Sequence, residues 1–229
     1  MNIVEEFKGI SGEICKPGQG CLTYFVRLAG CNLSCCWCDT KHAQSPDSGN
    51  YIKTPREVFE TVTKPFEGAR HVLFTGGEPL LQRDELVEFF RLYRWSDPTC
   101  LQCVTIETNG SLPFLRNQLH VPRTGSSVSI VADYKLPSSG MTNKMQPPEA
   151  FLELTKDDYV KMVVATEGDL DMAIALLRTG PWVRRKFTPS ISPAFPPLLP
   201  TQMIVDRLWK ENIQDTILSV QIHKFLNLK

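Results

Sequence analysis

The feature that most constrains this chain is a group of three cysteines, Cys31, Cys35 and Cys38, with the spacing C-x3-C-x2-C. The group directly follows an apolar segment, residues 22–29, that is typical of a β-strand. A loop this short presents three thiolates to one region of space, which suits three corners of an iron–sulfur cube and leaves the fourth iron without a protein ligand. Electron carriers usually have all four irons ligated, so the open iron predicts a site where a small molecule binds and reacts.

Two other interpretations of the cysteine loop remain, a zinc knuckle and a structural disulfide. Zinc takes four ligands, and Cys36 or His42 can supply the fourth. The disulfide is the weaker interpretation, because eight cysteines in 229 residues are too few for a stapled secreted scaffold. No signal peptide precedes them, and free cysteines fit a reducing compartment, so we expect a cytoplasmic protein.

Size and charge limit the remaining possibilities. With 229 residues, of which 42% are hydrophobic, the chain can bury one full core, and we expect a single domain over residues 1–229. The 25 basic and 25 acidic residues cancel, which favours neither a nucleic-acid nor a membrane partner. No apolar run reaches the about 20 residues that span a bilayer.

Apolar patterning alternates between strands and helices along the chain. Thr54, Pro55 and Glu57 form a capping-box pattern that begins a helix. We expect further helices at residues 80–95, 170–178 and 202–209. The expected strands are a short one that runs into a turn within residues 1–13, and residues 22–29, 71–75, 103–106, 128–133, 159–165 and 216–221. Residues 183–188 give a weaker strand pattern, because three of them in a row are basic. This alternation predicts parallel βαβ units. About seven such strands cannot close an eight-stranded ring, so the predicted fold class is α/β, a partial, open TIM-like barrel.

Polar motifs follow several of these strands. In parallel barrels the chemistry gathers at the carboxyl ends of the strands. The motifs that we place there are the cysteine loop, Gly76-Gly77-Glu78-Pro79, Glu107-Thr108-Asn109-Gly110, Asp133-Tyr134-Lys135 and Thr188-Pro189-Ser190. A glycine pair exposes backbone carbonyls to a bound ammonium group, and Glu78 can offset its charge, although taken alone this motif is more often a tight turn.

The cysteine spacing and the GGEP sequence one βα unit later resemble the radical S-adenosylmethionine (SAM) superfamily. In that superfamily the amine and carboxylate of SAM chelate the open iron, and an electron from the cluster yields a 5′-deoxyadenosyl radical. From about residue 9 to the C-terminus the chain also resembles the 7-carboxy-7-deazaguanine synthases, more weakly at residues 43–70 and 111–127. The segments that carry this resemblance are residues 11–13, 25–33, 35–42, 75–79, 107–110, 135–139 and 221–227.

The resemblance implies a radical SAM core, reduced in helices, that binds a 4Fe–4S cluster, SAM and Mg2+. It implies conversion of 6-carboxy-5,6,7,8-tetrahydropterin to 7-carboxy-7-deazaguanine with loss of ammonia, in the queuosine and 7-deazapurine pathway. SAM is regenerated in this reaction, since the radical removes hydrogen from C6 of the pterin and hydrogen returns after ring contraction. A flavodoxin or ferredoxin is the expected reductant and a homodimer the expected assembly.

Site residues follow from the resemblance, position by position. It places the cluster on Cys31, Cys35 and Cys38, and Mg2+ on the hydroxyl of Thr40, with waters and the substrate carboxylate completing the magnesium ligands. The residues that it places along SAM are Trp37, Cys38, Asp39, Gly76, Gly77, Glu78, Asp133, Tyr134, Lys135, Thr188, Pro189 and Ser190. The residues that it places at the pterin are Ile10, Ser11, Gly12, Arg27, Thr75, Glu107, His223 and Lys229, the last through its terminal carboxylate.

Arg27 and His223 are the expected partners of the substrate carboxylate, because a guanidinium grips a carboxylate through two parallel hydrogen bonds. From the sequence alone, however, Arg27 is equally well a salt-bridged strand end. The acidic side chain of Glu107 is the natural acceptor for the N–H donors of the pterin edge.

The chain departs from the family pattern at two motifs. Many relatives have Gln-Gly-Glu-Gly where this chain has residues 11–14, Ser-Gly-Glu-Ile. The chain therefore lacks the glutamine side chain that would contact the substrate. Many have Ser-Pro-Lys where this chain has Asp133-Tyr134-Lys135, so the SAM hydrogen bonds there need not be the same. Cys36 is next to Cys35 and is expected to be a spectator, and Cys100 and Cys103 are expected to be buried thiols.

Two rival functions share part of these motifs. An activating enzyme that generates a glycyl radical on a partner protein would have the cysteine loop and GGEP, without the Thr40 metal site and the His223 tail. A non-enzymatic zinc adaptor would be colourless and would not cleave SAM. The sequence does not identify the electron donor, the oligomeric state or the consumer of the product.

Overall fold

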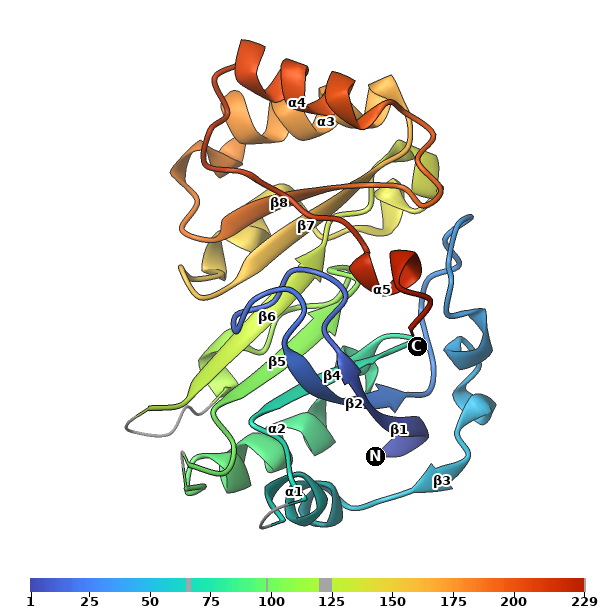
Figure 1. Ribbon diagram of the computed structural model, residues 1–229, viewed down its shortest axis with the longest axis vertical. Coiled ribbons are helices and arrows are strands. Elements are labelled where there is room, and N and C mark those ends of the chain that lie inside the picture. The colour runs from blue at the N-terminus through green and yellow to red at the C-terminus, as the bar shows by residue number, and fades with distance from the viewer. Residues whose placement is uncertain (65–66, 98, 120–124, 229) are drawn as a thin grey trace.

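A computed structural model describes residues 1–64, 67–97, 99–119 and 125–228 (Figure 1). Within these residues nine strands form one sheet in the order β3-β1-β2-β4-β5-β6-β7-β8-β9. The strands are β1 (Asn2–Ile10), β2 (Leu22–Leu28), β3 (Tyr51–Ile52), β4 (His71–Gly76), β5 (Cys103–Thr108), β6 (Ser127–Asp133), β7 (Tyr159–Val164), β8 (Thr188–Pro193) and β9 (Ile217–Leu218).

The sheet is mostly parallel and does not close. β1 runs antiparallel to both β2 and β3, whereas each neighbouring pair from β2 to β9 is parallel. Short strands of two residues, β3 and β9, form the two edges. The predicted fold class, an open partial barrel of parallel strands, is therefore confirmed.

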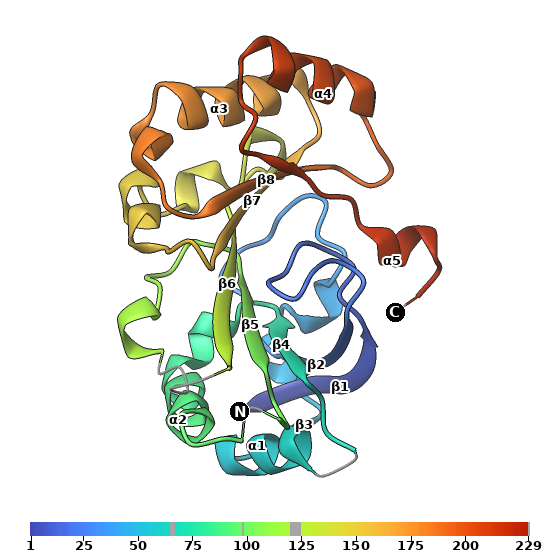
Figure 2. The same ribbon diagram turned by 60° about the vertical axis from the view of Figure 1, so that its left-hand side comes forward.

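Helices cover the outer face of the sheet unevenly. The α-helices are α1 (Pro55–Thr63), α2 (Arg83–Tyr93), α3 (Glu167–Arg178), α4 (Thr201–Lys210) and α5 (Ile222–Phe225). Figure 2 shows α2 and α3 on one side of the sheet and α5 on the other. The connections between β5, β6 and β7 contain only 3-10 turns among the described residues, so the expectation of a barrel reduced in helices is also confirmed. The 3-10 turns are η1 (Lys41–Ala43), η2 (Pro46–Ser48), η3 (Pro79–Gln82), η4 (Arg116–Gln118), η5 (Pro137–Ser139), η6 (Thr142–Lys144), η7 (Pro148–Glu153) and η8 (Pro181–Arg184).

None of the helices in the described part of the chain is long and apolar enough to cross a membrane.

The predicted capping box begins α1. The Thr54 hydroxyl accepts a hydrogen bond from the backbone N–H of Glu57 at 3.2 Å, and the Glu57 carboxylate accepts one from the backbone N–H of Thr54 at 2.7 Å. Pro55 occupies the first helical position, where its missing N–H costs nothing. The helix thus begins where the sequence pattern placed its start.

One predicted strand, residues 183–188, is wrong. Residues 181–184 form the 3-10 turn η8, and the neighbouring strand β8 begins only at Thr188. Val183, Arg184 and Lys186 are exposed, because a run of basic side chains cannot enter the buried sheet. The strand is therefore formed by residues 188–193, and it begins at the residue where the predicted strand was expected to end.

The two faces of the sheet differ in polarity because side chains alternate along each strand. Phe74 and Ile106 on the helix side are fully buried, and the Phe74 ring meets Phe89 of α2 edge-on at 4.8 Å. The inner face instead carries small polar side chains such as Thr23, His71 and Thr105, all buried. An apolar outer layer thus holds the fold together, while the inner face is available for binding.

Candidate functional site

A cavity of about 720 Å³ opens at the carboxyl ends of the parallel strands and extends along the inner face of the sheet. Successive strands contribute one or two inward-facing side chains each: Arg27 from β2, Thr75 from β4, Glu107 from β5, Asp133 from β6 and Lys161 from β7. The cysteine loop and α5 line it as well. Motifs that are far apart in the sequence are therefore brought together around one space.

The cysteine loop enters this cavity with three of its four sulfurs. Cys31, Cys35 and Cys38 all line the cavity and are free of disulfide bonds, whereas Cys36 is exposed and does not line it. The backbone N–H of Cys31 donates to the carbonyl of Gln44 at 2.8 Å, and that of Cys38 donates to the Cys35 carbonyl at 3.2 Å. These bonds hold the loop in a tight turn, and Cys36 lies outside it, as expected from its adjacency to Cys35.

The donor set fits an iron–sulfur cluster better than a single ion. Within the described residues, these three sulfurs do not form a group whose ligand atoms all lie within 4.8 Å of one another, as one metal ion would need. The Cys31 sulfur accepts the backbone N–H of Leu33 at 3.5 Å and the Asn109 amide at 3.8 Å, which are contacts suited to a cluster thiolate. Burial raises the pKa of Cys31 and Cys35, and the charge of the nearby Cys38 raises both pKa values further. A bound cation would shift the equilibrium of these groups toward the thiolates.

Gly76 and Gly77 bring the end of β4 into direct contact with the cysteine loop. Gly76 has a φ of +139°, and a Cβ there would lie 2.1 Å from the carbonyl oxygen of Leu28. A Cβ on Gly77 would lie 2.1 Å from the carbonyl oxygen of Gly30. No larger residue fits either position, and both glycines line the cavity beside the cysteines.

Glu78 does not face the cavity. Its carboxylate is fully buried and accepts hydrogen bonds from the Leu80 N–H at 2.8 Å, the Thr108 hydroxyl at 2.8 Å and the Asn109 N–H at 2.6 Å. Burial raises the pKa of Glu78 to about 7. This side chain joins the loop after β4 to the loop after β5, and Asn109 in turn donates to Asn32 of the cysteine loop at 2.9 Å. Glu78 is thus placed to position the cysteine loop.

Arg27 combines the two interpretations that the sequence left open. Its Nε donates to the Glu5 carboxylate at 2.8 Å, and its guanidinium lies over the Phe7 ring at 5.7 Å. The same side chain lines the cavity. Arg27 is therefore both a salt-bridged strand end and a cation that faces the cavity.

A charged floor connects β6 and β7 to the loop after β1. Lys161 is paired with Glu13 and, at 3.2 Å, with Asp133, which is also paired with Lys135. Although burial disfavours its charged form, the carboxylates of Asp133, Glu13 and Glu107 raise the pKa of Lys161 well above its ordinary value. Burial and the charge of Glu13 raise the pKa of Glu107 to about 7. The floor therefore holds a permanent cation beside a carboxyl group that titrates near neutrality.

Sequence reasoning missed Lys161 and the side chain of Glu13. The signal for Lys161 was present, since a lysine in the middle of the apolar segment 159–164 must face either a partner or a polar cavity. Glu13 carried no comparable signal, because it lies in a polar loop whose path depends on the whole fold.

The C-terminal segment forms another wall of the cavity. His223 and Lys224 of α5 line it, and the Ile222 N–H donates to the carbonyl of Gly12 at 2.9 Å. A Cβ on Gly12 would lie 1.8 Å from His223 Nδ1, so the histidine packs directly on this glycine. Lys224 is paired with Asp39 of the cysteine loop at 2.7 Å. Lys229 lies outside the described residues.

The other predicted residues divide into two groups. Ile10, Trp37, Asp39 and Thr40 line the cavity, and the Thr40 hydroxyl donates to the Asp39 carboxylate at 3.0 Å. The indole N–H of Trp37 is buried without a partner among the described residues, and Lys135 lies 5.2 Å from its ring. An unpaired donor beside the cysteines leaves a hydrogen bond for a ligand to make. Ser11 is buried and does not line the cavity.

Two predicted placements need correction. The side chain of Tyr134 points away from the cavity, because it follows Asp133 in the strand alternation, and it packs edge-on against Trp182 at 5.0 Å in the core. Thr188, Pro189 and Ser190 lie at the beginning of β8 and not at its carboxyl end, where Ala194 and Phe195 line the cavity instead. Strand β8 begins several residues later than the predicted strand 183–188, which explains this error.

Comparison with known proteins gives a consistent picture. The family described as the radical SAM superfamily matches residues 26–120. A 7-carboxy-7-deazaguanine synthase of Clostridium acetobutylicum is 39% identical, over 98% of this chain and 95% of its own length. One from Methanospirillum hungatei is 34% identical, over 100% of this chain and 86% of its own. The crystal structure of QueE from Escherichia coli has a similar fold, with a TM-score of 0.67 at 21% identity, covering 95% of this chain and 92% of that one.

Proposed function

This chain belongs to the 7-carboxy-7-deazaguanine synthase family of radical SAM enzymes, and we propose that it converts 6-carboxy-5,6,7,8-tetrahydropterin to 7-carboxy-7-deazaguanine with loss of ammonia. The observation that carries the proposal is a single cavity, lined by residues of five parallel strands. Three cysteine sulfurs without disulfide bonds, a glycine pair and the charged floor all border it. Nothing in the described residues favours the glycyl-radical activating enzyme as a second function.

Cys31, Cys35 and Cys38 would hold the 4Fe–4S cluster, and its fourth iron would be left for SAM. Gly76 and Gly77 present backbone atoms beside the cysteines, and Trp37, Asp39, Asp133 and Lys135 line the adjoining space, so these residues would bind SAM. Glu78 acts indirectly in this proposal, by holding the two loops in place. Tyr134, Thr188, Pro189 and Ser190 are no longer proposed as side-chain contacts.

The substrate would occupy the part of the cavity between the charged floor and α5. Arg27 and His223 face this space and would hold the substrate carboxylate, while Thr75 and Glu107 would accept the N–H groups of the pterin edge. The backbone around Ile10, Ser11 and Gly12 would meet the same edge of the pterin as Thr75 and Glu107, and the terminal carboxylate of Lys229 remains a proposed ligand. Mg2+ would bind the Thr40 hydroxyl together with the substrate carboxylate and waters.

When bound, the cluster and SAM supply a radical that removes hydrogen from C6 of the pterin. The residues of this chain orient that carbon, keep water out and hold charge. Arg27 and His223 fix the carboxylate end, and Glu107 fixes the opposite edge, so that the pterin cannot rotate in the cavity. Lys161 pairs with Glu13 and Asp133, and although burial opposes it, the charges of Lys135 and Lys161 lower the pKa of Asp133. Burial and the charge of Glu13 raise the pKa of Glu107 to about 7, so Glu107 can exchange a proton near neutral pH.

The remaining expectations stay proposals. We propose one domain over residues 1–229, a location in the cytoplasm, a homodimer, and a flavodoxin or ferredoxin as reductant. The small-molecule nature of the substrate follows from the family.

The decisive experiment is an anaerobic assay of iron-reconstituted protein with carboxytetrahydropterin, SAM, dithionite and Mg2+. Formation of 7-carboxy-7-deazaguanine and ammonia without net consumption of SAM is expected, and Cys35→Ala should abolish both the brown colour and the product. A brown protein that cleaves SAM but leaves this pterin unchanged would overturn the assignment of substrate.

The magnesium site is tested by Thr40→Ala in the same assay. The substitution should spare the brown colour, slow deazaguanine formation and alter the metal preference, because it removes the one protein hydroxyl offered to the ion. Unchanged turnover and metal dependence would mean that Thr40 is not a magnesium ligand.

A further inference from the structure

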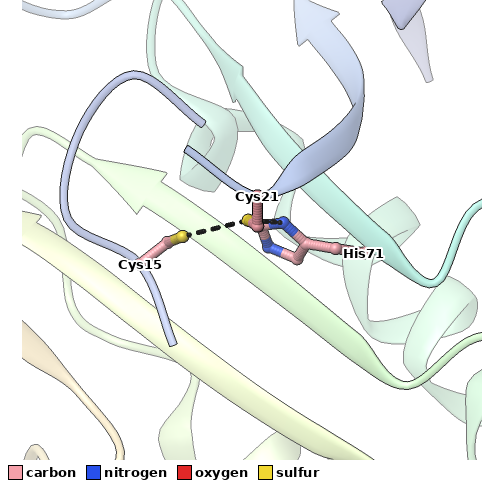
Figure 3. Close-up of side chains that lie close together, drawn as sticks. All are labelled: Cys15, Cys21 and His71. Carbon is pink, nitrogen blue, oxygen red and sulfur yellow. Dashed lines mark hydrogen bonds between the residues drawn. The ribbon is translucent and has the colours of Figure 1, made fainter. Parts of the chain in front are cut away.

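A second sulfur site lies at the amino ends of β2 and β4, away from the cysteine loop. Cys15, Cys21 and His71 converge there, with all three possible ligand atoms within 4.8 Å of one another (Figure 3). The Cys15 and Cys21 sulfurs are 3.5 Å apart, and the Cys21 sulfur is 3.3 Å from His71 Nδ1. Both cysteines are free thiols in this structure.

Hydrogen bonds hold both ring nitrogens of His71 in place. Nδ1 lies 2.8 Å from the Thr23 hydroxyl and 3.3 Å from the Cys21 sulfur, and Nε2 lies 2.9 Å from the Thr105 hydroxyl. The Thr23 hydroxyl is also within 3.0 Å of the Cys21 carbonyl oxygen. The imidazole is therefore fixed against the Cys21 sulfur.

This network disfavours a metal site, although two cysteines and a histidine are common zinc ligands. Both ring nitrogens of His71 already have hydrogen-bond partners in the protein, Nδ1 with Thr23 and Nε2 with Thr105. The Cys15 thiol also has a partner, because it donates a hydrogen bond to the carbonyl oxygen of Gly18, 3.1 Å from its sulfur. Each polar atom of the site is satisfied by the protein itself.

The two thiols have unequal surroundings. Cys15 is 1% exposed, and its S–H donates to the Gly18 carbonyl, whereas Cys21 is partly exposed and its sulfur lies within hydrogen-bond distance of Cys15, Thr23 and His71. The titratable groups around Cys21 are Cys15 on its loop, His71 on β4 and Cys103 on β5. The Cys15 hydrogen bond, followed by those from His71 and Thr23, lowers the pKa of Cys21 to about 4 despite burial. The hydrogen bond to Cys21 and burial raise the pKa of Cys15.

The loop between the two cysteines contacts the cavity wall through Gly12, which lines the cavity. Its Gln19 amide donates to the Gly12 carbonyl at 2.8 Å, and the Ser11 N–H donates to the Cys21 carbonyl at 2.9 Å. Gly18 and Gly20 have positive φ angles of 109° and 88°, which a short turn between two adjacent sulfurs requires. The residue after Cys21, Leu22, is 82% exposed, so small molecules can reach this end of the barrel.

We propose that Cys15 and Cys21 form a redox-active dithiol that exchanges with small-molecule disulfides of the glutathione class. The Cys21 thiolate attacks one sulfur of glutathione disulfide, the S–S bond breaks, and one glutathione thiolate leaves. Cys15 then gives its proton to solvent and attacks the Cys21 sulfur, which displaces the second glutathione thiolate. The two protein sulfurs are oxidised to a disulfide and one glutathione disulfide is reduced to two thiolates. The site depends neither on the proposed cluster nor on the proposed substrate.

The test uses the cluster-loaded protein, incubated anaerobically with glutathione and glutathione disulfide at a series of ratios. Remaining thiols are alkylated and the peptides are analysed by mass spectrometry. Cys15 and Cys21 should become protected together as the ratio becomes more oxidising, in a linked peptide that has lost two hydrogens. Failure to find this peptide at the most oxidising ratio overturns the proposal.

Two single variants distinguish the roles of the sulfurs. Cys15→Ser should accumulate a mixed disulfide of glutathione on Cys21, because the second thiol that displaces it is gone. Cys21→Ser should leave Cys15 unmodified, and Cys100→Ser should behave as the parent does. Equal reactivity of Cys15 in the Cys21→Ser variant would contradict the assignment of Cys21 as the attacking sulfur.

Two further measurements use the unsubstituted protein, so they do not depend on the folding of a variant. Alkylation of Cys21 should change less than about twofold between pH 6 and 8, whereas a free thiol such as N-acetylcysteine gains roughly 100-fold over two pH units below its pKa. A Cys21 rate that rises as steeply as the free thiol overturns the proposal. Stoichiometric zinc in the purified protein, removed together with the reactivity of the thiols by chelation, would also overturn it in favour of a metal site.

Discussion

At the scale of single residues, the cavity is defined by charges that the fold forces into close contact. Glu107, Glu13 and Asp133 face the same space, and Lys161 is the cation that they share. Burial raises the pKa of Glu107, and the charges of Glu13 and Asp133 add to this rise. Lys161 opposes the rise, but its ammonium pairs directly with the other two carboxylates.

The raised pKa of Glu107 predicts a pH dependence. The ionised carboxylate is the better acceptor for substrate N–H groups, so kcat/KM for the pterin should rise with pH through about 7. Glu107→Gln should remove this inflection and lower kcat/KM by roughly 10-fold to 100-fold at pH 8, the effect of a lost hydrogen bond to a charged group. Assays of both proteins between about pH 6 and 8.5 provide the measurement, and an inflection retained by the variant would assign the titration to another group.

Lys161 predicts a stability effect. Its ammonium is buried between Glu13 and Asp133, so Lys161→Met should leave two buried carboxylates without their cation and reduce the free energy of unfolding by about 3–5 kcal/mol. Lys64→Met, which breaks the exposed pair between Lys64 and Glu67, is the matched control and should change stability little. Denaturant titrations compare the three proteins. Equal effects of both substitutions would mean that Lys161 is not held in a dry environment.

At the scale of secondary structure, the starts of all predicted strands except β8 were predicted to within one residue, whereas several strand ends were predicted less closely. The sequence located the loops after β2, β4, β5 and β6 because each carries a distinctive polar motif directly after an apolar run. Thr188, Pro189 and Ser190 were misplaced because the basic run 184–186 hid the true start of β8. Tyr134 was assigned to the site because motif reasoning does not distinguish the two faces of a strand.

The close contact between the end of β4 and the cysteine loop predicts the effect of a single methyl group. Gly77→Ala would place a Cβ 2.1 Å from the Gly30 carbonyl, so the cysteine loop must move and cluster content should fall. Gly168→Ala is the control, because the nearest atom to its Cβ is 3.8 Å away and alanine favours the helix by up to about 1 kcal/mol. Iron content and absorbance after reconstitution give the measurement. Full cluster occupancy in Gly77→Ala would show that the loop tolerates displacement.

At the scale of the whole molecule, the two ends of the chain meet at the cavity. Gln19 and Gly12 from the first loop bind the backbone and side chains of residues 220–222, and His223 packs on Gly12. Sequence patterns could not reveal this contact, because it joins residues about 200 positions apart and depends on the curvature of the entire sheet. The resemblance to a known family supplied His223, whereas Lys161 lies outside its motifs and the side chain of Glu13, within one of them, was given no role.

The contact between the first loop and the C-terminal segment predicts that SAM cleavage and pterin binding can be separated. A chain that ends at Val220 lacks α5 and with it His223 and Lys224, but it keeps Cys31, Cys35, Cys38 and the glycine pair. It should therefore bind the cluster and cleave SAM when reduced, while KM for the pterin rises by at least about 10-fold, because one carboxylate partner and one wall of the cavity are missing. His223→Ala is the milder companion, since it removes the imidazole and leaves the helix. If the shortened chain retained its affinity for the pterin, the substrate would have to lie against the charged floor alone, without contact to the C-terminal segment.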